Sequence, residues 1–275
     1  MSYSNVSGRK MPFIVRYIAD LLMFRHLAVN LVASDLRARF RRSYLGILWA
    51  VIQPLGFSLT IGYVWGSLFN YASVWEYALY VFSGMIVWEY FAAVMNVSQD
   101  SLTSAEGYLK QTRIPFLIFQ VRTALTGQVV FWAGFVGLIT MMAVMNKLPP
   151  IGTHLWYVPA FFGVALMFMA PLAIVMSILG TKLRDLKYIT MLAVQALFFV
   201  SPVMLGKEIF EAESMVVLNI INPMAQLLNM FREPLFDASP WTISQMSTVG
   251  MWIGGLWIVA IWMSAAEGRK LVFAL

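Results

Sequence analysis

The amino-acid sequence predicts an all-α integral membrane protein with six transmembrane helices. Of its 275 residues, 60% are hydrophobic and only 12% are charged, and the mean hydropathy is +0.75. Soluble proteins average about 25% charged residues. Several uncharged runs also exceed the roughly 20 residues that a helix needs to cross a hydrocarbon core of about 30 Å. Most of the chain is therefore expected to lie in a membrane.

The same composition excludes several classes of function. The chain has no cysteine and two distant histidines, so it offers no disulfide, no cysteine nucleophile and no predicted metal site. The net charge of +6 comes from basic residues beside apolar runs, which argues against nucleic-acid binding. No Gly-x-x-x-x-Gly-Lys-Ser/Thr phosphate loop, nucleophile elbow or paired acidic motif is present. Two classes remain: a transport subunit energised by another protein, and an integral membrane transferase acting on a lipid-linked substrate.

Residues 1–45 are predicted to form a cytoplasmic tail and an interfacial helix, with a disordered tail as the alternative. Between Met11 and Phe40 apolar residues recur at helical spacing among charged ones, which is typical of a helix in the membrane interface, broken near Asn30. The N-terminus is expected to be retained, since the first apolar run is too long for a signal peptide. Four arginines hold this end in the cytoplasm: Arg37, Arg39, Arg41 and Arg42.

The transmembrane domain is predicted over residues 46–270, and its first span covers 46–69. Pro54 should kink this helix because proline has no N–H to donate. Small residues recur every four positions on one face, where they let another helix approach closely: Ser58, Gly62 and Gly66.

The second span, 77–97, is predicted to return to the cytoplasm and to be followed by a short helix at about 100–113. Leu102, Ala105 and Leu109 fall on one face of that helix. Charged residues fall on the adjacent face: Glu106, Lys110 and Arg113. The helix should therefore rest its apolar face on the bundle.

The remaining spans are predicted at 116–145, 155–180, 188–205 and 246–265. Between the last two, in the region 207–245, two apolar pieces at 215–221 and 224–231 are separated by Asn222-Pro223, and each is too short to cross. Paired half-helices that enter and leave on one side fit this pattern. The segments assigned to the inside hold 15 of the 19 basic residues, so both termini are expected in the cytoplasm.

Two ionisable residues, Glu89 and Arg122, fall within predicted spans. A charge at membrane depth is costly and usually has a partner. Counting residues from the ends of their spans places the two at similar depth, so an ion pair is predicted. The alternatives are that Arg122 extends to the interface and that Glu89 is protonated or faces a wet tunnel.

Residues Ser34 to Leu55 read SDLRARFRRSYLGILWAVIQPL, which resembles the opening signature of ABC type-2 exporter permeases of the polysaccharide export branch. Four later segments resemble the same family in the same order: Lys110–Phe116, Arg184–Leu186, Phe199–Val203 and Asn222-Pro223 with Arg232. The likeness spans about Asp35 to Ala265.

This resemblance implies a homodimeric permease of the bacterial inner membrane that joins two ATP-binding cassette subunits. The cargo would be a lipid-linked O-antigen, with capsule or teichoic-acid chains as alternatives. ATP and Mg²⁺ would bind to the partner subunit, so no cofactor and no enzymatic activity are expected in this chain.

The resemblance also implies roles for groups of residues. The family's ATPase-coupling helix falls on Glu106, Tyr108, Lys110 and Arg113. The two short apolar pieces on either side of Asn222-Pro223 are predicted to shape the outer gate of the tunnel, and Asn222, Pro223 and Arg232 are its candidate residues. Besides anchoring the chain, the arginine cluster would bind a carrier diphosphate through bidentate contacts from Arg37, Arg39, Arg41 and Arg42. Aromatic faces suited to sugar rings would line a tunnel, although interfacial belts or core packing also explain them: Trp49, Phe57, Tyr63, Trp88, Tyr90 and Phe91.

Overall fold

The computed structural model describes residues 23–68, 73–111, 114–204 and 220–267. Every regular element in these ranges is a helix, which confirms the predicted all-α class. Some predicted features lie outside the described residues: the tail at 1–22, Arg113, the piece at 215–219 and the basic residues Arg269 and Lys270.

Five helices are long and apolar enough to cross a membrane. They are α3 (Trp49–Leu68, after the 3₁₀ turn η1, Gly46–Leu48), α4 (Val74–Val97), α6 (Phe116–Val144), α7 (Tyr157–Lys182, after η4, Thr153–Trp156) and α12 (Ile243–Glu267). These bounds agree with five predicted spans to within a few residues. The sixth, α8 (Leu186–Val200), has 15 residues and a length of about 22 Å, so helix length alone supports five spans rather than six.

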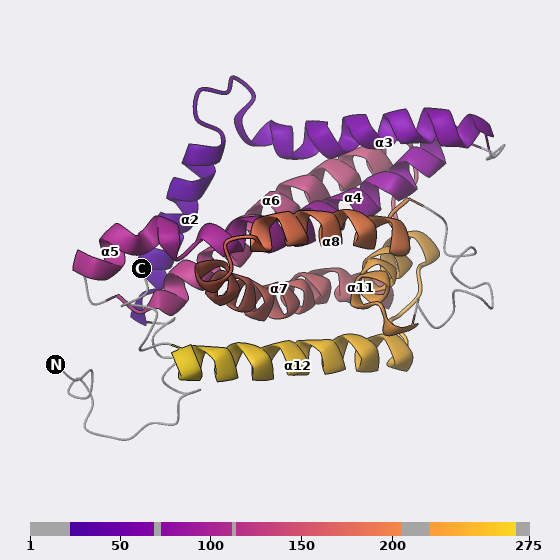
Figure 1. Cartoon of the computed structure of the whole chain (residues 1–275). Helices are drawn as coiled ribbons and strands as arrows, with labels where there is room; N and C mark the ends of the chain where they lie inside the picture. The colour runs from indigo at the N-terminus through magenta and orange to yellow at the C-terminus, as the bar shows by residue number, and fades with distance from the viewer. Residues whose placement is uncertain (1–22, 69–72, 112–113, 205–219, 268–275) are drawn as a thin grey trace.

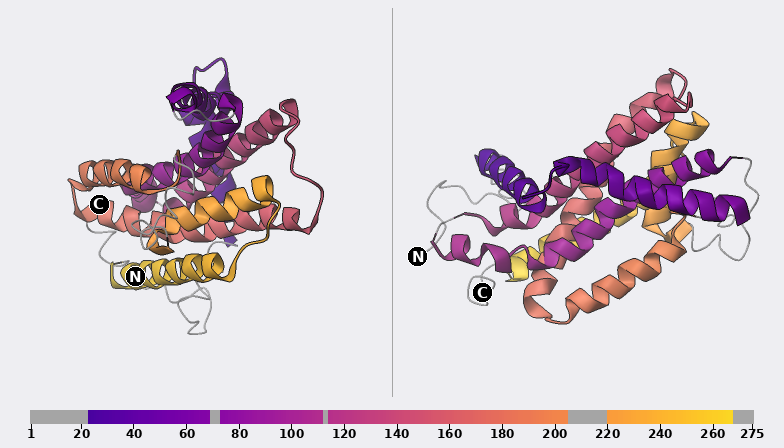
Figure 2. Two further views of the ribbon diagram at one scale, coloured as in Figure 1. Left: turned by 90° about the vertical axis from the view of Figure 1, so that its right-hand side faces the viewer. Right: turned by 90° about the horizontal axis from the view of Figure 1, so that it is seen from above.

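The long helices run side by side, and α2 (Arg25–Arg39) lies across one end of the bundle (Figure 1). The short helix α5 (Glu106–Gln111) lies at that same end, whereas α11 (Pro223–Arg232) lies at the other. Figure 2 shows the same arrangement from two further sides. The predicted break near Asn30 is wrong, because α2 runs through this exposed residue without interruption. Asparagine lowers helix stability by less than about 1 kcal/mol, too little to end a packed helix.

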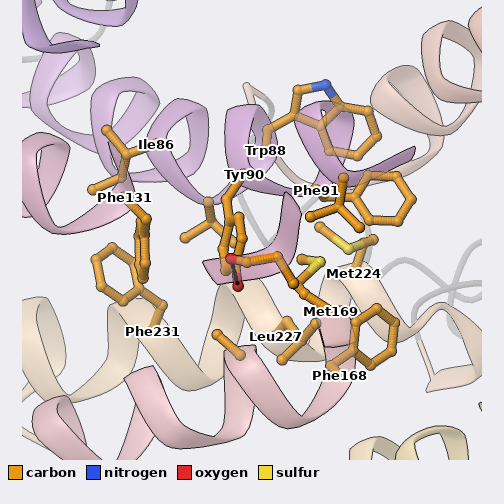
Figure 3. Packing of buried hydrophobic residues seen from close by; sticks show 14 of the residues in the cluster. Ile86, Trp88, Tyr90, Phe91, Phe131, Phe168, Met169, Met224, Leu227 and Phe231 are labelled. Atoms are coloured by element: carbon orange, nitrogen blue, oxygen red, sulfur yellow. Dashed lines mark hydrogen bonds between the residues drawn. The ribbon is translucent and has the colours of Figure 1, made fainter. Parts of the chain in front are cut away.

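The central helix of the bundle is α4. Residues 81–88 of this helix are all buried. Figure 3 shows Ile86, Tyr90 and Phe91 of α4 beside side chains of three other helices, whereas Trp88 points away from them. The neighbouring side chains are Phe131 of α6, Phe168 and Met169 of α7, and Met224, Leu227 and Phe231 of α11. The ring centroids of Phe161 and Phe231 lie 5.0 Å apart, which joins α7 to α11. One apolar core therefore holds the spans and the short helix together.

The predicted small-residue face of α3 is confirmed. Ser58 is fully buried, and a Cβ atom added to Gly62 would lie 2.7 Å from the Cβ of Ala78 on α4. The helix continues through Pro54, whose carbonyl accepts a hydrogen bond from Ser58 Oγ at 2.6 Å. The kink predicted at Pro54 stays a prediction. Because only this face of α3 packs closely, most of the helix is left exposed.

The segment after α4 is not the single helix predicted at 100–113. It forms two 3₁₀ turns, η2 (Ser98–Asp100) and η3 (Thr103–Ala105), before the six-residue α5. Serine hydroxyls bond to carbonyls three residues earlier, from Ser101 to Ser98 at 2.7 Å and from Ser104 to Ser101 at 3.1 Å, and such bonds compete with regular helix. The predicted apolar face is confirmed: Leu102 and Ala105 are fully buried, and Leu109 packs against the core.

Candidate functional site

A cluster of polar side chains joins three elements at the end of the bundle that carries α2. The Nε atom of Arg122, on α6, lies 3.5 Å from Oδ2 of Asp35 on α2. Its Nη2 atom donates to the hydroxyl of Ser104, in η3, at 3.2 Å. Thr126, one turn further along α6, donates to the same Asp35 oxygen at 3.4 Å. Arg122 thus connects α2 with the segment that precedes α5.

This cluster corrects the predicted ion pair between Glu89 and Arg122. The helix α2 packs against the start of α6 and places the Asp35 carboxylate beside the Arg122 guanidinium. Asp35 was missed because it stands among the arginines of a segment predicted to lie apart from the spans. No periodic signal in the sequence marks it as a partner of α6.

Glu89 instead opens into a small cavity of about 280 Å³. The cavity lies between the connection that follows α2, the first turns of α3, and the middle of α4 and α6. Its walls are formed by Arg39, Phe40, Ser43, Trp49, Ala50, Gln53, Pro54, Glu89, Tyr90, Ala93, Gly127 and Val130. A carboxylate and a guanidinium therefore line the same partly open cavity.

The predicted phosphate-binding arginines lie together at the end of α2. Arg37 and Arg39 occupy its last turn, and Arg41 and Arg42 follow in the turn beyond. All four are exposed, and Arg42 has a φ of 64°, in the left-handed region. Only Arg39 is among the residues that line the cavity. A role in binding phosphate stays a prediction.

The six aromatic residues predicted to line a tunnel divide into two groups. Trp49, Phe57 and Tyr63 of α3 are exposed. Those of α4 are buried: Trp88 packs on Phe91 and on Phe198 of α8, while Tyr90 donates its hydroxyl proton to the carbonyl of Ala124 at 2.9 Å.

For Trp88 and Phe91 the structure therefore corrects the prediction, because both rings fill the core within one chain. Tyr90 is also a core residue, with its ring stacked on Phe131, but part of its side chain reaches the wall of the cavity. The tunnel-lining prediction remains open only for the three exposed rings of α3.

The predicted coupling residues lie on the exposed side of α5. Glu106 and Lys110 form an ion pair one turn apart. The side chain of Tyr108 and the whole of Arg113 lie outside the described part of the chain. Because Leu102 and Ala105 are buried beneath, this charged pair is presented outward on a segment fixed to the bundle.

Arg232, at the end of α11, is buried and holds three segments together. Its guanidinium donates to Ser83 Oγ at 3.0 Å and to the Tyr80 carbonyl at 3.0 Å, both on α4. It also donates to the carbonyls of Pro202 and, at 2.8 Å, Val203, beyond the end of α8. The guanidinium carbon lies 3.7 Å from the Tyr80 ring centroid. The partners are neutral dipoles and a π face.

Asn222 and Pro223 begin α11. The side-chain oxygen of Asn222 accepts the backbone N–H of Met224 at 3.0 Å, and Pro223 occupies the first helical turn. The side-chain amide of Asn222 donates to Ser201 Oγ at 2.9 Å. The predicted outer-gate residues are thus brought together around the end of α8. In the described ranges no group of three or more metal-ligating residues occurs.

Comparison with known proteins gives consistent matches. Residues 10–236 match the family model described as ABC-2 type transporter. An O-antigen export system permease protein RfbA of Klebsiella pneumoniae is 23% identical over 224 residues, which cover 82% of this chain and 83% of that protein. The protein of the same name from Myxococcus xanthus is 22% identical over 249 residues, 87% of this chain and 94% of that protein.

Replacing Arg232 by Lys is expected to destabilise the fold by about 2–4 kcal/mol, because an ammonium group has three donors and no planar fork, which leaves buried carbonyls unsatisfied. Thermal unfolding of the purified protein in detergent measures the change. The control is Lys147→Gln, which breaks an exposed 2.8 Å ion pair with Glu76 and should cost less than about 1 kcal/mol. If both variants unfold at the wild-type temperature, Arg232 does not hold the three segments together.

Proposed function

Because the chain belongs to the ABC-2 type transporter family, we propose that it exports a lipid-linked O-antigen polysaccharide across the bacterial inner membrane. The observation that carries this proposal is the family match over residues 10–236, together with relatives named as O-antigen export permeases that align along most of their length. The chain is the multi-pass membrane subunit of such an exporter, and five of its helices are long enough to span the bilayer.

A permease is needed because a glycan cannot cross hydrocarbon unaided. Each sugar hydroxyl would lose its hydrogen bonds to water, at a cost of several kcal/mol per unsatisfied group. A tunnel through protein can supply polar groups and water that replace those hydrogen bonds. A lipid carrier keeps the attached end of the polymer at the membrane, where the tunnel begins.

The family implies an ATP-binding cassette partner. We infer that two copies of that partner bind ATP and Mg²⁺ and supply the energy, since this sequence has no phosphate-binding loop: Gly206-Lys207 is followed by Glu208. The segment 98–111 is the proposed docking site. Its buried leucine and alanine fix it to the core, and its exposed Glu106–Lys110 pair faces outward.

The proposed topology has six spans, with both termini in the cytoplasm. The crossing that begins with α8 would be completed by the residues beyond Val200, whose carbonyls Arg232 satisfies. Because α11 has ten residues and a length of about 15 Å, it is too short to cross and would re-enter from the outer side. The arginines at the end of α2 would then lie at the cytoplasmic headgroups.

Two copies of the chain are proposed to form the tunnel between them. The least buried spans are α3 and α12, so each chain has apolar surface left for a second copy or for lipid. Three exposed aromatic rings of α3 would offer faces to passing sugars: Trp49, Phe57 and Tyr63. Such faces pack on sugar rings without fixing the register of the polymer.

The proposed function predicts that cells lacking this chain keep lipid-linked polysaccharide in the cytoplasm and lose it from the surface. Immunoblots of intact and permeabilised cells measure both pools. A variant of the ATPase subunit that binds but does not hydrolyse ATP should give the same result. If the purified chain alone turned over a lipid-linked substrate, it would be a transferase and the proposal would fail.

The docking role of α5 can be separated from the stability of its ion pair by exchanging the charges. The double change Glu106→Lys with Lys110→Glu keeps an ion pair one turn apart, but it inverts the pattern that a partner meets. We expect the swapped chain to fold as the wild type and to lose most of the co-purified ATPase subunit. Wild-type binding by the swapped chain would rule out recognition through this pair.

Re-entry of α11 predicts that residues on both sides of it face the same compartment. The native chain has no cysteine, so single cysteines at Ile221 and at the exposed Asp237 can be labelled with a membrane-impermeant maleimide. Both should react from the outside, as should the control Ile151→Cys, whereas Leu183→Cys should react only after permeabilisation. Reaction of the first two from opposite sides would mean that the segment crosses the membrane.

A further inference from the structure

Glu89 is the one residue between Val81 and Tyr90 that is not buried. Its carboxylate opens into the 280 Å³ cavity beside α3. Within the part of the chain that the structure describes, no hydrogen bond or ion pair reaches this carboxylate. A carboxylate inside a span is costly and marks a functional position more often than a structural one. The cavity can therefore accept a ligand or a water molecule that bonds to this carboxylate.

Other side chains bring unused hydrogen-bonding groups to the same cavity. Ser43 comes from the connection after α2, and Gln53 comes from the second turn of α3. Among the described residues neither side chain has a hydrogen-bond partner. Arg39 lines the cavity without forming an ion pair with Glu89. A guanidinium, a hydroxyl, an amide and a carboxylate thus line one cavity, and they come from α2, the connection after it, α3 and α4.

The cavity also has aromatic walls. Phe40 and Trp49 line it beside the polar groups, and Trp49 is 45% exposed. A volume of 280 Å³ lies just below the usual range of ligand pockets, about 300 to 1,000 Å³. The cavity can therefore accept a group the size of one sugar ring, and it is too small for an oligosaccharide.

These features match the chemistry of a pyranose. Each sugar hydroxyl both donates and accepts, so it can donate to the Glu89 carboxylate and pair with the Gln53 amide, which offers both functions. The apolar C–H face of the ring suits an aromatic wall. A diphosphate alone does not fit, because Glu89 would repel it, and an acyl chain would leave the polar groups unpaired. A single carboxylate is also a poor site for a metal ion.

We propose that this cavity is a subsite for the sugar that is joined directly to the carrier diphosphate. Arg39, at the end of α2, lies toward the phosphate, and Glu89 and Gln53 hold the hydroxyls of the ring. The inference rests on the proposed function, because it takes the cargo to be a glycan on a lipid diphosphate. The proposal adds that the permease chain itself recognises the first sugar before the polymer enters the tunnel.

The test uses the full chain purified with its ATPase subunit in lipid nanodiscs. The probes are a polyprenyl diphosphate that carries one sugar, offered as glucose, galactose and N-acetylglucosamine, and the same diphosphate without a sugar. Glu89→Gln and Gln53→Ala should each weaken binding of the best sugar-bearing probe by roughly tenfold or more, since a charged or amide partner is lost. Binding of the bare diphosphate should not weaken.

The matched control is Glu76→Gln, the same substitution at the outer end of the same helix, which should affect neither probe. Because Gln53 is exposed on α3, its variant tests the subsite even if Glu89→Gln folds poorly. An equal loss of affinity for both probes would mean that the cavity binds only the lipid diphosphate. Unchanged affinity for both would mean that the cavity holds only water. Each result overturns the subsite. Neither binding result bears on export by wild-type cells, which is the separate measurement that tests the proposed function.

Discussion

Within a bilayer a polar group has no water to bond. The arrangement of the end of the bundle that carries α11 follows from how one guanidinium, that of Arg232, finds its hydrogen-bond partners. Arg232 is 5% exposed, and its N–H groups reach four neutral oxygen atoms on α4 and beyond α8. Each oxygen also needs a donor, so cation and acceptors satisfy one another. A Cβ atom on Gly84 would lie 2.3 Å from the guanidinium, so glycine is required there.

Features that depend on length and composition were predictable from the sequence. Apolar runs longer than a bilayer is thick predicted five helices to within a few residues, and the spacing of Ser58, Gly62 and Gly66 predicted where α3 packs. The apolar face of the 98–111 segment was also predictable, from the helical spacing of Leu102, Ala105 and Leu109. The division of that segment into 3₁₀ turns was not predictable, because it accompanies hydrogen bonds from the hydroxyls of Ser101 and Ser104 to backbone carbonyls.

The side-chain partners within the candidate site were less predictable, because they depend on how elements meet. Trp49 and Trp88 have the same chemistry and both lie within predicted spans, yet one is 45% exposed and the other 5%. The difference comes from the central place of α4, which hydropathy does not reveal. In the same way, depth counted along two helices brought Glu89 level with Arg122, but it carried no information about α2, which supplies Asp35 instead.

The cluster around Arg122 has a mechanical consequence. One planar group holds Asp35 at 3.5 Å and Ser104 at 3.2 Å, and the Ser104 hydroxyl is itself committed to the carbonyl of Ser101. A displacement of the η3 turn by a fraction of a hydrogen-bond length must either break a bond or travel to α2. Through Arg122, a movement of η3 would thus be passed to α2, the helix whose last turn carries Arg37 and Arg39.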